Sequence, residues 1–364
     1  MIYFFSLSLI IYLFFTIIEP KLIFLTFIRI IYLSTCIFSY LHFTITSNLI
    51  NIVFIVYFIC DAIKVFIIFD KNYIKSLSLF KQDKYLAKKE NKQFWFIFII
   101  SFILIFIASE GNLNFINPRL FYEFLIESNR SGSILWPILA LIIGQLLATY
   151  SYSLRNLTLI TGLSYFLGSK GLVVNPSIFF MQYVFLYKKN YRKFIVPLSI
   201  LFVCLLSYYL NIISNKNLFQ FFTSYYDYTA NIERIDEKIP LLPNPKYFLA
   251  YFTDFFPGIN RILRTVPQEL YADYFSFEYG NGKSPGILFF DSLLRIGILL
   301  YPFFILLEAL LIKALINIFL KTNSILALRL LIFKESIKAS LLVFLINFIS
   351  LNAKTIIYKK YLYK

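Results

Sequence analysis

The sequence predicts an all-helical membrane protein, and three observations lead to that fold class. Of the 364 residues, 59% are hydrophobic, and the mean hydropathy is +0.74. A water-soluble domain does not expose that much apolar surface, so lipid is the expected solvent. Runs such as 1–18, 94–108 and 194–213 carry few or no charges, and each approaches the roughly 20 residues that cross a bilayer as a helix. A membrane-spanning β-barrel would instead show alternating segments of about 10 residues.

Basic residues set the expected orientation of these spans. Residues 70–93 contain seven lysines and three acids, residues 188–193 contain four cations and no acid, and four lysines lie within 354–364. By the positive-inside rule, these three segments are expected to face the cytoplasm. Orientation and contact with anionic lipid headgroups account for the basic patches, so nucleic acid is not an expected partner. We interpret 70–93 as a basic cytoplasmic loop, in which the lysine-rich run 81–92 forms a short surface helix.

About eleven transmembrane helices follow from the hydrophobic runs and this orientation. They form a single membrane domain, residues 1–364, with the N-terminus outside and the C-terminus inside. The predicted spans are 2–18, 22–44, 50–69, 94–109, 133–150, 156–167, 172–187, 194–213, 297–318, 324–333 and 339–353.

One long segment interrupts this pattern. Residues 213–296 are polar, aromatic and rich in turns, and they carry one more acidic than basic side chain although the whole chain has a net charge of +16. A large loop without a basic excess is expected on the outer side of the membrane. We therefore expect the functional groups in this external loop and in the turns at 168–171 and 334–338, which reach the same side.

Two arginines of the loop suit a pyrophosphate ligand. Pro257 and Gly258 end one element and open a short helix, on which Arg261 and Arg264 are three residues apart and share a face. Each guanidinium offers planar, paired N–H donors and keeps its charge. The alternative is that both are solvated and pair with acidic side chains of the next helix.

Two carboxylates on that next helix suit acid–base chemistry. Glu269 and Asp273 are four residues apart, after Pro267, so they also share one face. A carboxylate there would act as a general base toward a sugar hydroxyl, provided that its pKa fits the task. The alternative is that both are salt-bridge partners of neighbouring cations.

Further external side chains complete the candidate binding set. Lys170 lies in a Gly-Ser-Lys-Gly turn, where glycines allow a ligand to approach the backbone closely; neither a strand nor the full P-loop pattern surrounds it. Tyr226 would stack on a sugar ring or anchor at the membrane interface. Arg295 would bind an anion or snorkel to the interface. Arg234 and Lys334 add external cations.

Polar residues inside the predicted spans carry weaker signals. Asp61 and Lys64 are three residues apart within one span. Charges at such positions are functional by default, yet these two are also able to pair with each other or to reach the inner interface. The three cysteines, all inside predicted spans, and the single His42 lack metal-ligand spacing, so no metal and no cofactor is expected.

The order of these motifs resembles that of Wzy-type polymerases, the repeat-unit polymerases of O-antigen and capsular polysaccharide. That family has many helices, a large external loop and a Gly-Ser-Arg-Gly-like turn, whose place is taken here by 168–171. It also has a Pro-Gly pair, a Gly-x-Gly-x-Ser stretch and an acidic segment that ends in glycine, which correspond to 257–258, 280–284 and 291–297. The order matches over roughly residues 94–353. This chain departs from the pattern by having lysine in the 168–171 turn and Arg-Ile before the final glycine.

The resemblance implies a GT-C-like glycosyltransferase in the bacterial inner membrane. Its donor would be a growing glycan on undecaprenyl pyrophosphate, and its acceptor a lipid-linked single repeat unit. The external lysines and arginines named above would stabilise the leaving pyrophosphate without a metal, and Glu269 or Asp273 would activate the acceptor hydroxyl. A flippase and a chain-length regulator are the implied protein partners. The alternatives are an O-antigen ligase, which uses the same donor, and a lipid-linked glycan flippase or transporter.

Overall fold

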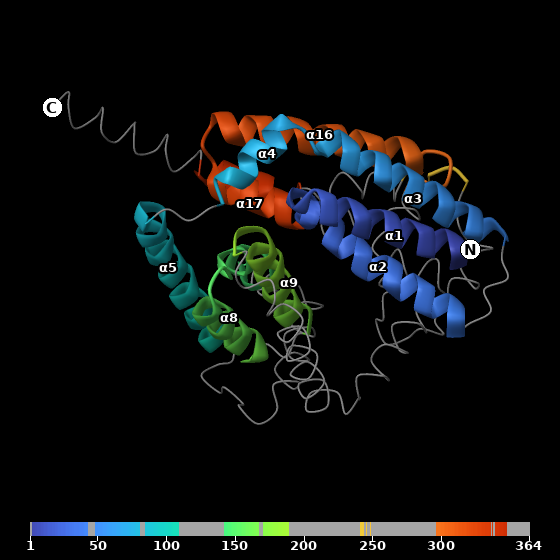
Figure 1. The fold of residues 1–364 in the computed structure, drawn as a ribbon. Coiled ribbons are helices and arrows are strands. Elements are labelled where there is room, and N and C mark those ends of the chain that lie inside the picture. The colour runs from blue at the N-terminus through green and yellow to red at the C-terminus, as the bar shows by residue number, and fades with distance from the viewer. Residues whose placement is uncertain are drawn as a thin grey trace. The chain divides into compact units, whose positions relative to one another are not determined.

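The computed structural model describes residues 2–42, 48–80, 84–108, 142–166, 170–188, 241–243, 245, 248, 296–335, 337 and 339–347. Within these ranges every regular element is a helix and no strand is present, which confirms the all-α class. The chain divides into two compact units, residues 1–74 with 222–322 and residues 75–221 with 323–364. We call them unit 1 and unit 2 and describe each by itself (Figure 1).

Unit 1 begins with a helical hairpin. α1 (Ile2–Ile18) and α2 (Ile23–His42) pack against each other on either side of a short 3₁₀ turn, η1 (Pro20–Leu22). The chain direction changes by 120° across this break. Both helices are strongly apolar and carry no acidic residue in their first turns, so packing rather than capping accounts for their stability.

Local polar contacts fix the turn between α1 and α2. Pro20 has no N–H and therefore interrupts the hydrogen-bond ladder of α1. The side chain of Glu19 accepts a hydrogen bond from the backbone amide of Lys21 (3.4 Å). The hydroxyls of Thr16 and Thr26 lie 2.6 Å apart and join the two helices beside the turn. These contacts explain why an apolar run of this length reverses here instead of continuing.

Two further long helices of unit 1, α3 (Asn48–Ile68) and α16 (Tyr301–Lys321), lie side by side although more than 200 residues separate them in the sequence (Figure 1). The contacts between them follow the same order along both helices: Tyr57 contacts Tyr301, Lys64 contacts Glu308, and Asp70, just after α3, contacts Lys313. Because residue numbers rise together, the two helices are parallel.

α1 also runs parallel to α3. The Phe5 ring packs edge-on against Phe58 at 5.4 Å, and Phe15 meets Phe66 at 5.7 Å. α2 runs back along α1 as the second arm of the hairpin. These relative directions are the same as in the predicted topology, in which spans 2–18, 50–69 and 297–318 share one direction. Which end of unit 1 faces the cytoplasm stays a prediction.

The described residues of unit 2 contain four further α-helices around an apolar core. They are α5 (Lys84–Ala108), α8 (Leu154–Phe166), α9 (Lys170–Tyr187) and α17 (Ile325–Lys334), and a further helical stretch covers 339–347. α4 (Lys71–Ser78) crosses the boundary between the units. The core of unit 2 consists of buried side chains from α5, α8 and the segment before α8: Phe94, Ile105, Ile143, Leu147, Tyr150, Ile160 and Leu163.

The lysine-rich run after α4 does not form the separate surface helix expected for 81–92. From Lys84 onward it is continuous with the apolar span, so that α5 has 25 residues. Lysine, glutamate and alanine are strong helix formers, and no glycine or proline separates them from the apolar residues that follow. The basic run therefore forms the first turns of the same helix that contains the predicted span 94–109.

The end of the predicted span 133–150 departs from regular helix. Residues Ile142–Leu146 form a π-helical turn and Leu147–Tyr150 a 3₁₀ turn. The side-chain amide of Asn175 donates to the Gly144 carbonyl (3.0 Å), and that of Asn156 donates to the Tyr150 carbonyl (2.9 Å). Irregular backbone in a buried, apolar environment requires its polar groups to be bonded inside the protein, and these two asparagines supply such bonds.

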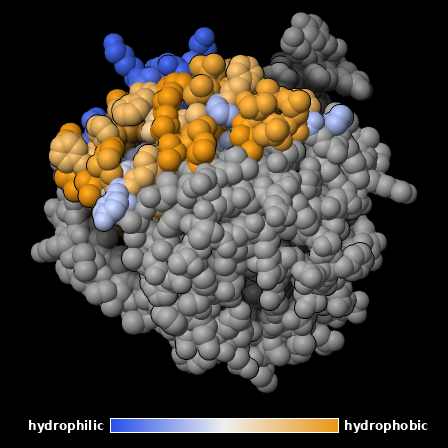
Figure 2. Space-filling model, turned by 90° about the vertical axis from the view of Figure 1, so that its right-hand side faces the viewer, coloured by the Kyte–Doolittle hydropathy of each residue, from blue (hydrophilic) through white to orange (hydrophobic). Residues whose placement is uncertain are grey.

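Apolar side chains cover much of the described surface, as Figure 2 shows for one face. On α1 the exposed residues include Tyr3, Ile10 and Ile17, and α5 presents a similar row of isoleucines and phenylalanines.

Among the described residues, α16 is the one helix long and apolar enough to cross a membrane alone, and the bent α1–α2 pair counts as a second if it is one span. The segment Asn91–Ile107 is apolar but shorter. The expected number of about eleven membrane crossings stays a prediction.

Candidate functional site

The predicted site residues lie almost entirely outside the described part of the chain. Lys170 and Lys334 are described in their backbone only, as the first residue of α9 and the last residue of α17. The other seven fall in ranges that the structure does not describe: Tyr226, Arg234, Arg261, Arg264, Glu269, Asp273 and Arg295. Their proposed grouping therefore stays a prediction.

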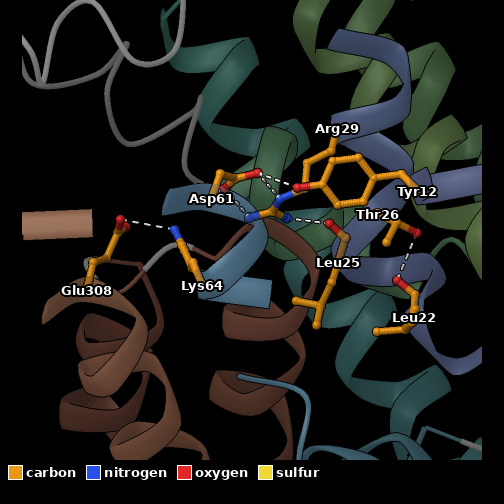
Figure 3. Close-up of polar contacts among 8 residues, drawn as sticks. All are labelled: Tyr12, Leu22, Leu25, Thr26, Arg29, Asp61, Lys64 and Glu308. Carbon is orange, nitrogen blue, oxygen red and sulfur yellow. Dashed lines mark hydrogen bonds and ion pairs between the residues drawn. The ribbon is translucent and has the colours of Figure 1, made fainter. Parts of the chain in front are cut away.

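The described residues bring together a different set of charged groups, inside unit 1 (Figure 3). Asp61 of α3 receives two hydrogen bonds from Arg29 of α2, from Nε to Oδ2 at 2.6 Å and from Nη2 to Oδ1 at 2.8 Å. The hydroxyl of Tyr12 on α1 donates to the same carboxylate at 3.2 Å. Arg29 also donates to the Leu25 carbonyl. One carboxylate thus joins three helices.

A second ion pair links α3 to α16. Lys64 Nζ lies 3.0 Å from Glu308 Oε2, and the two residues are 244 positions apart in the sequence. Asp61 and Lys64 thus each have a partner on another helix, whereas pairing with each other was one of the roles considered for them. As Figure 3 shows, they extend toward partners on different helices.

A third pair lies where α3 ends. Lys313 Nζ is 3.3 Å from Asp70 Oδ2, and the other carboxylate oxygen of Asp70 accepts a hydrogen bond from the Tyr73 amide at the start of α4 (2.9 Å). The exposed fraction of the carboxylate side chain is 6% for Asp61, 31% for Glu308 and 24% for Asp70. The pair formed by Arg29 and Asp61 is the most deeply buried of the three.

The electrostatics of this cluster are balanced. Three cations and three anions form three pairs, so the net charge of the set is zero. An unpaired charge buried among apolar helices is costly, and a bidentate arginine–carboxylate contact is among the strongest available ways to offset that cost. This arrangement holds α1, α2, α3 and α16 in one register.

Sequence reasoning named Asp61 and Lys64 but missed Arg29 and Glu308. The signal was present, because Arg29 is the only formally charged residue between Lys21 and Asp61. Glu308 is likewise the only acid between Asp291 and Glu335. A lone charge in an apolar run needs a partner on another helix, but the sequence does not say which helix.

Unit 2 holds polar side chains of another kind. Arg329 is 3% exposed and lies over the Phe80 ring, 5.5 Å from its centroid, in cation–π geometry. Gln182 is fully buried, and neither atom of its amide has a hydrogen-bond partner among the described residues. Within the described ranges, no three His, Cys, Asp or Glu side chains gather in a way that would hold a metal ion.

A comparison of the chain with protein-family models, curated proteins and solved structures finds no match.

Proposed function

We propose that this protein is a multi-pass inner-membrane glycosyltransferase that polymerises undecaprenyl-pyrophosphate-linked repeat units into O-antigen or capsular polysaccharide. The observation that carries the proposal is the helical pair α8 and α9. α8 ends at Phe166, α9 begins at Lys170, and the two helices pack together. Lys170 and Gly171 are the first two residues of α9, so the last two residues of the Gly-Ser-Lys-Gly motif open the second helix of this pair, which supports the resemblance to Wzy-type polymerases.

The position of Lys170 suits an anionic ligand. As the first residue of an 18-residue helix, it stands beside backbone N–H groups that have no partner within the helix. The helix dipole adds a partial positive charge at this end. A lysine and a helix N-terminus together favour a pyrophosphate group. Lysine binds as a point charge where the family's arginine would bind through two donors.

The proposed reaction is a displacement at the anomeric carbon of the donor glycan. The acceptor hydroxyl oxygen forms the new bond to this carbon, and the bond from the carbon to the pyrophosphate oxygen breaks. The hydroxyl proton passes to Glu269 or Asp273. Undecaprenyl pyrophosphate leaves with its negative charge stabilised by Lys170, Arg261 and Arg264. Arg234, Arg295, Lys334 and Tyr226 would hold the rest of the lipid-linked glycan.

Polysaccharide banding on a gel tests this function. A deletion strain is complemented, at matched expression, with wild type, Lys170→Ala or the double variant Arg261→Ala/Arg264→Ala. Polymerase activity predicts core plus one repeat unit in the deletion strain, a full ladder with wild type, and no full ladder with Lys170→Ala or with the double variant. Lys321→Ala, on an exposed residue at the end of α16, is the matched control and should restore the ladder. A full ladder from the double variant would refute the arginine site.

The buried ion pairs of unit 1 favour transport of a lipid-linked glycan as a second candidate function, because intramembrane charges mark transport pathways in many membrane proteins. The two functions differ in where substrate accumulates after gene deletion. Loss of a transporter leaves lipid-linked repeat units on the cytoplasmic face, whereas loss of a polymerase leaves them on the outer face. Lectin binding to intact spheroplasts distinguishes the two. Core without any repeat unit on the gel, with lectin-accessible outer units, would instead indicate a ligase.

A further inference from the structure

A short segment from the predicted external loop is docked on the beginning of α16. The segment consists of Leu241, Leu242 and Pro243, and we call it the elbow. The carbonyl oxygen of Leu241 accepts a hydrogen bond from the backbone amide of Leu299 (3.2 Å), just before α16 begins. Both partners belong to unit 1. The elbow is thus bonded to the helix that best meets the requirements of a membrane span.

Gly297 makes this docking possible. Its φ is +80°, a conformation that residues with a Cβ adopt only at a cost. A Cβ at this position would lie 2.8 Å from the carbonyl carbon of Leu242 and 2.9 Å from the carbonyl oxygen of Leu241. The elbow backbone therefore occupies the space that a side chain would need. This contact gives a physical reason for the glycine that ends the 291–297 motif.

A second contact holds the following part of the loop to the same helix. The ring of Phe248 meets the ring of Phe304 edge-on, with centroids 5.6 Å apart. Phe304 is 9% exposed. The elbow and Phe248 together attach the loop along the first turn of α16.

Measured along α3, the elbow lies deeper than Asn48, the first residue of that helix and the end that is predicted to face outside. Tyr301, two residues after Leu299, stacks on Tyr57, and Tyr57 follows Asn48, the first residue of α3, by nine positions. At 1.5 Å per residue the first residue of α3 therefore extends about 14 Å beyond this level. Ile52, on that outer part of α3, is 57% exposed, so apolar surface continues outward past the elbow.

Among the described residues, large apolar side chains are exposed at the elbow and at the start of α16. Leu241, Leu242, Leu299 and Phe303 each have an exposed fraction of 63%. Four such side chains near one helix end are costly in water. They are the expected composition of a surface in contact with acyl chains.

We propose that the elbow is inserted among the acyl chains of the outer leaflet and is held there by Gly297. Irregular backbone at this depth is stable where its polar groups are bonded inside the protein, and two features of the elbow reduce that need: the Leu241 carbonyl accepts a hydrogen bond from the Leu299 amide, and Pro243 has no N–H. The partner is the hydrocarbon of the bilayer. The inserted elbow keeps the external loop against the membrane surface, where a lipid-linked substrate lies. This inference requires the membrane placement of unit 1 but not the polymerase chemistry.

Spin-label accessibility tests the insertion directly. Cys36, Cys60 and Cys204 are first replaced by alanine, and the full-length protein is reconstituted in vesicles of phosphatidylethanolamine and phosphatidylglycerol. A nitroxide is then attached to Leu242→Cys. Leu310→Cys, at an exposed apolar position in the middle of α16, is the lipid control, and Lys321→Cys, at its polar end, is the water control. Oxygen partitions into lipid and a nickel chelate stays in water.

The expected result is that the label at Leu242 matches the label at Leu310, with strong relaxation by oxygen and weak relaxation by the nickel chelate. A label at Leu242 that behaves like the one at Lys321 overturns the proposal. Gly297→Ala, added to each labelled protein, should raise nickel access at Leu242 several-fold and leave Leu310 unchanged. An unchanged Leu242 signal in that variant would overturn the role of Gly297 as the anchor. All of these readouts are independent of activity, so they remain decisive if the chain is not a polymerase.

Discussion

Unit 1 and unit 2 both bury polar side chains inside largely apolar helices, but they stabilise them by different means. Unit 1 uses ion pairs between helices, and its partners are far apart in the sequence: 32 positions for Arg29 and Asp61, and 244 for Lys64 and Glu308. Unit 2 uses neutral amides that bond to backbone carbonyls, as Asn156 does with Tyr150, six positions earlier, and Asn175 with Gly144, 31 positions earlier.

The difference indicates what each set of polar groups specifies. A charge in an apolar helix is stable only when an oppositely charged side chain contacts it. The ion pairs of unit 1 therefore determine which helices pack together. An amide that bonds a freed carbonyl stabilises a local break in a helix, so the asparagines of unit 2 maintain the irregular turns at 142–150. Specific substitutions separate these two roles.

The largest effect is expected from Asp61→Ala. Arg29 would remain buried without its carboxylate, and breaking a buried pair in this way costs about 3–5 kcal/mol. The double variant Arg29→Met/Asp61→Leu removes both charges and should recover most of that loss. Thermal unfolding in detergent, followed by circular dichroism, measures both. A single variant no less stable than the double variant would show that the pair does not stabilise unit 1.

An intermediate effect is expected from Asn156→Leu, which removes the donor to the Tyr150 carbonyl and should cost about 1–3 kcal/mol. Gln182→Leu is the matched control. It is also fully buried, but its amide has no hydrogen-bond partner among the described residues, so this change should be neutral or stabilising. Denaturant unfolding compares the two. Equal losses would contradict the assignment of the local role to Asn156.

The smallest effect is expected from Lys313→Ala. The lysine side chain is 39% exposed and its partner Asp70 is 24% exposed, and a pair as accessible as this contributes about 0–1 kcal/mol. In the same unfolding assay, the difference in unfolding free energy between wild type and Lys313→Ala should be small, and it should remain small at high salt. A loss as large as that of Asp61→Ala would mean that burial does not rank the three pairs.

The sequence predicts the helices of this protein much better than their partners. Long apolar runs locate α1, α2, α3 and α16 within a few residues, because an apolar run of this length favours a continuous helix. The extension of α5 through the lysine run and the irregular turns at 142–150 were missed. The first depends on helix propensity overriding a charge pattern, and the second on asparagines that bond from other segments.

The candidate site shows the same limit. Lone charges in spans are visible in the sequence, but the pairing of Lys64 with Glu308 depends on packing between helices 244 residues apart. The external residues chosen from motifs, such as Arg261 and Glu269, lie outside the described ranges. Their roles rest on spacing and on the resemblance alone.

A charge swap tests most directly the central claim that long-range ion pairs assemble unit 1. Lys64→Glu places a second carboxylate beside Glu308, and Glu308→Lys places a second ammonium beside Lys64, so each single variant should lower folded yield and thermal stability. The double variant Lys64→Glu/Glu308→Lys restores an ion pair in the opposite sense, and we expect its melting temperature to return close to that of wild type. A double variant that loses as much stability as the two single variants combined would contradict the account.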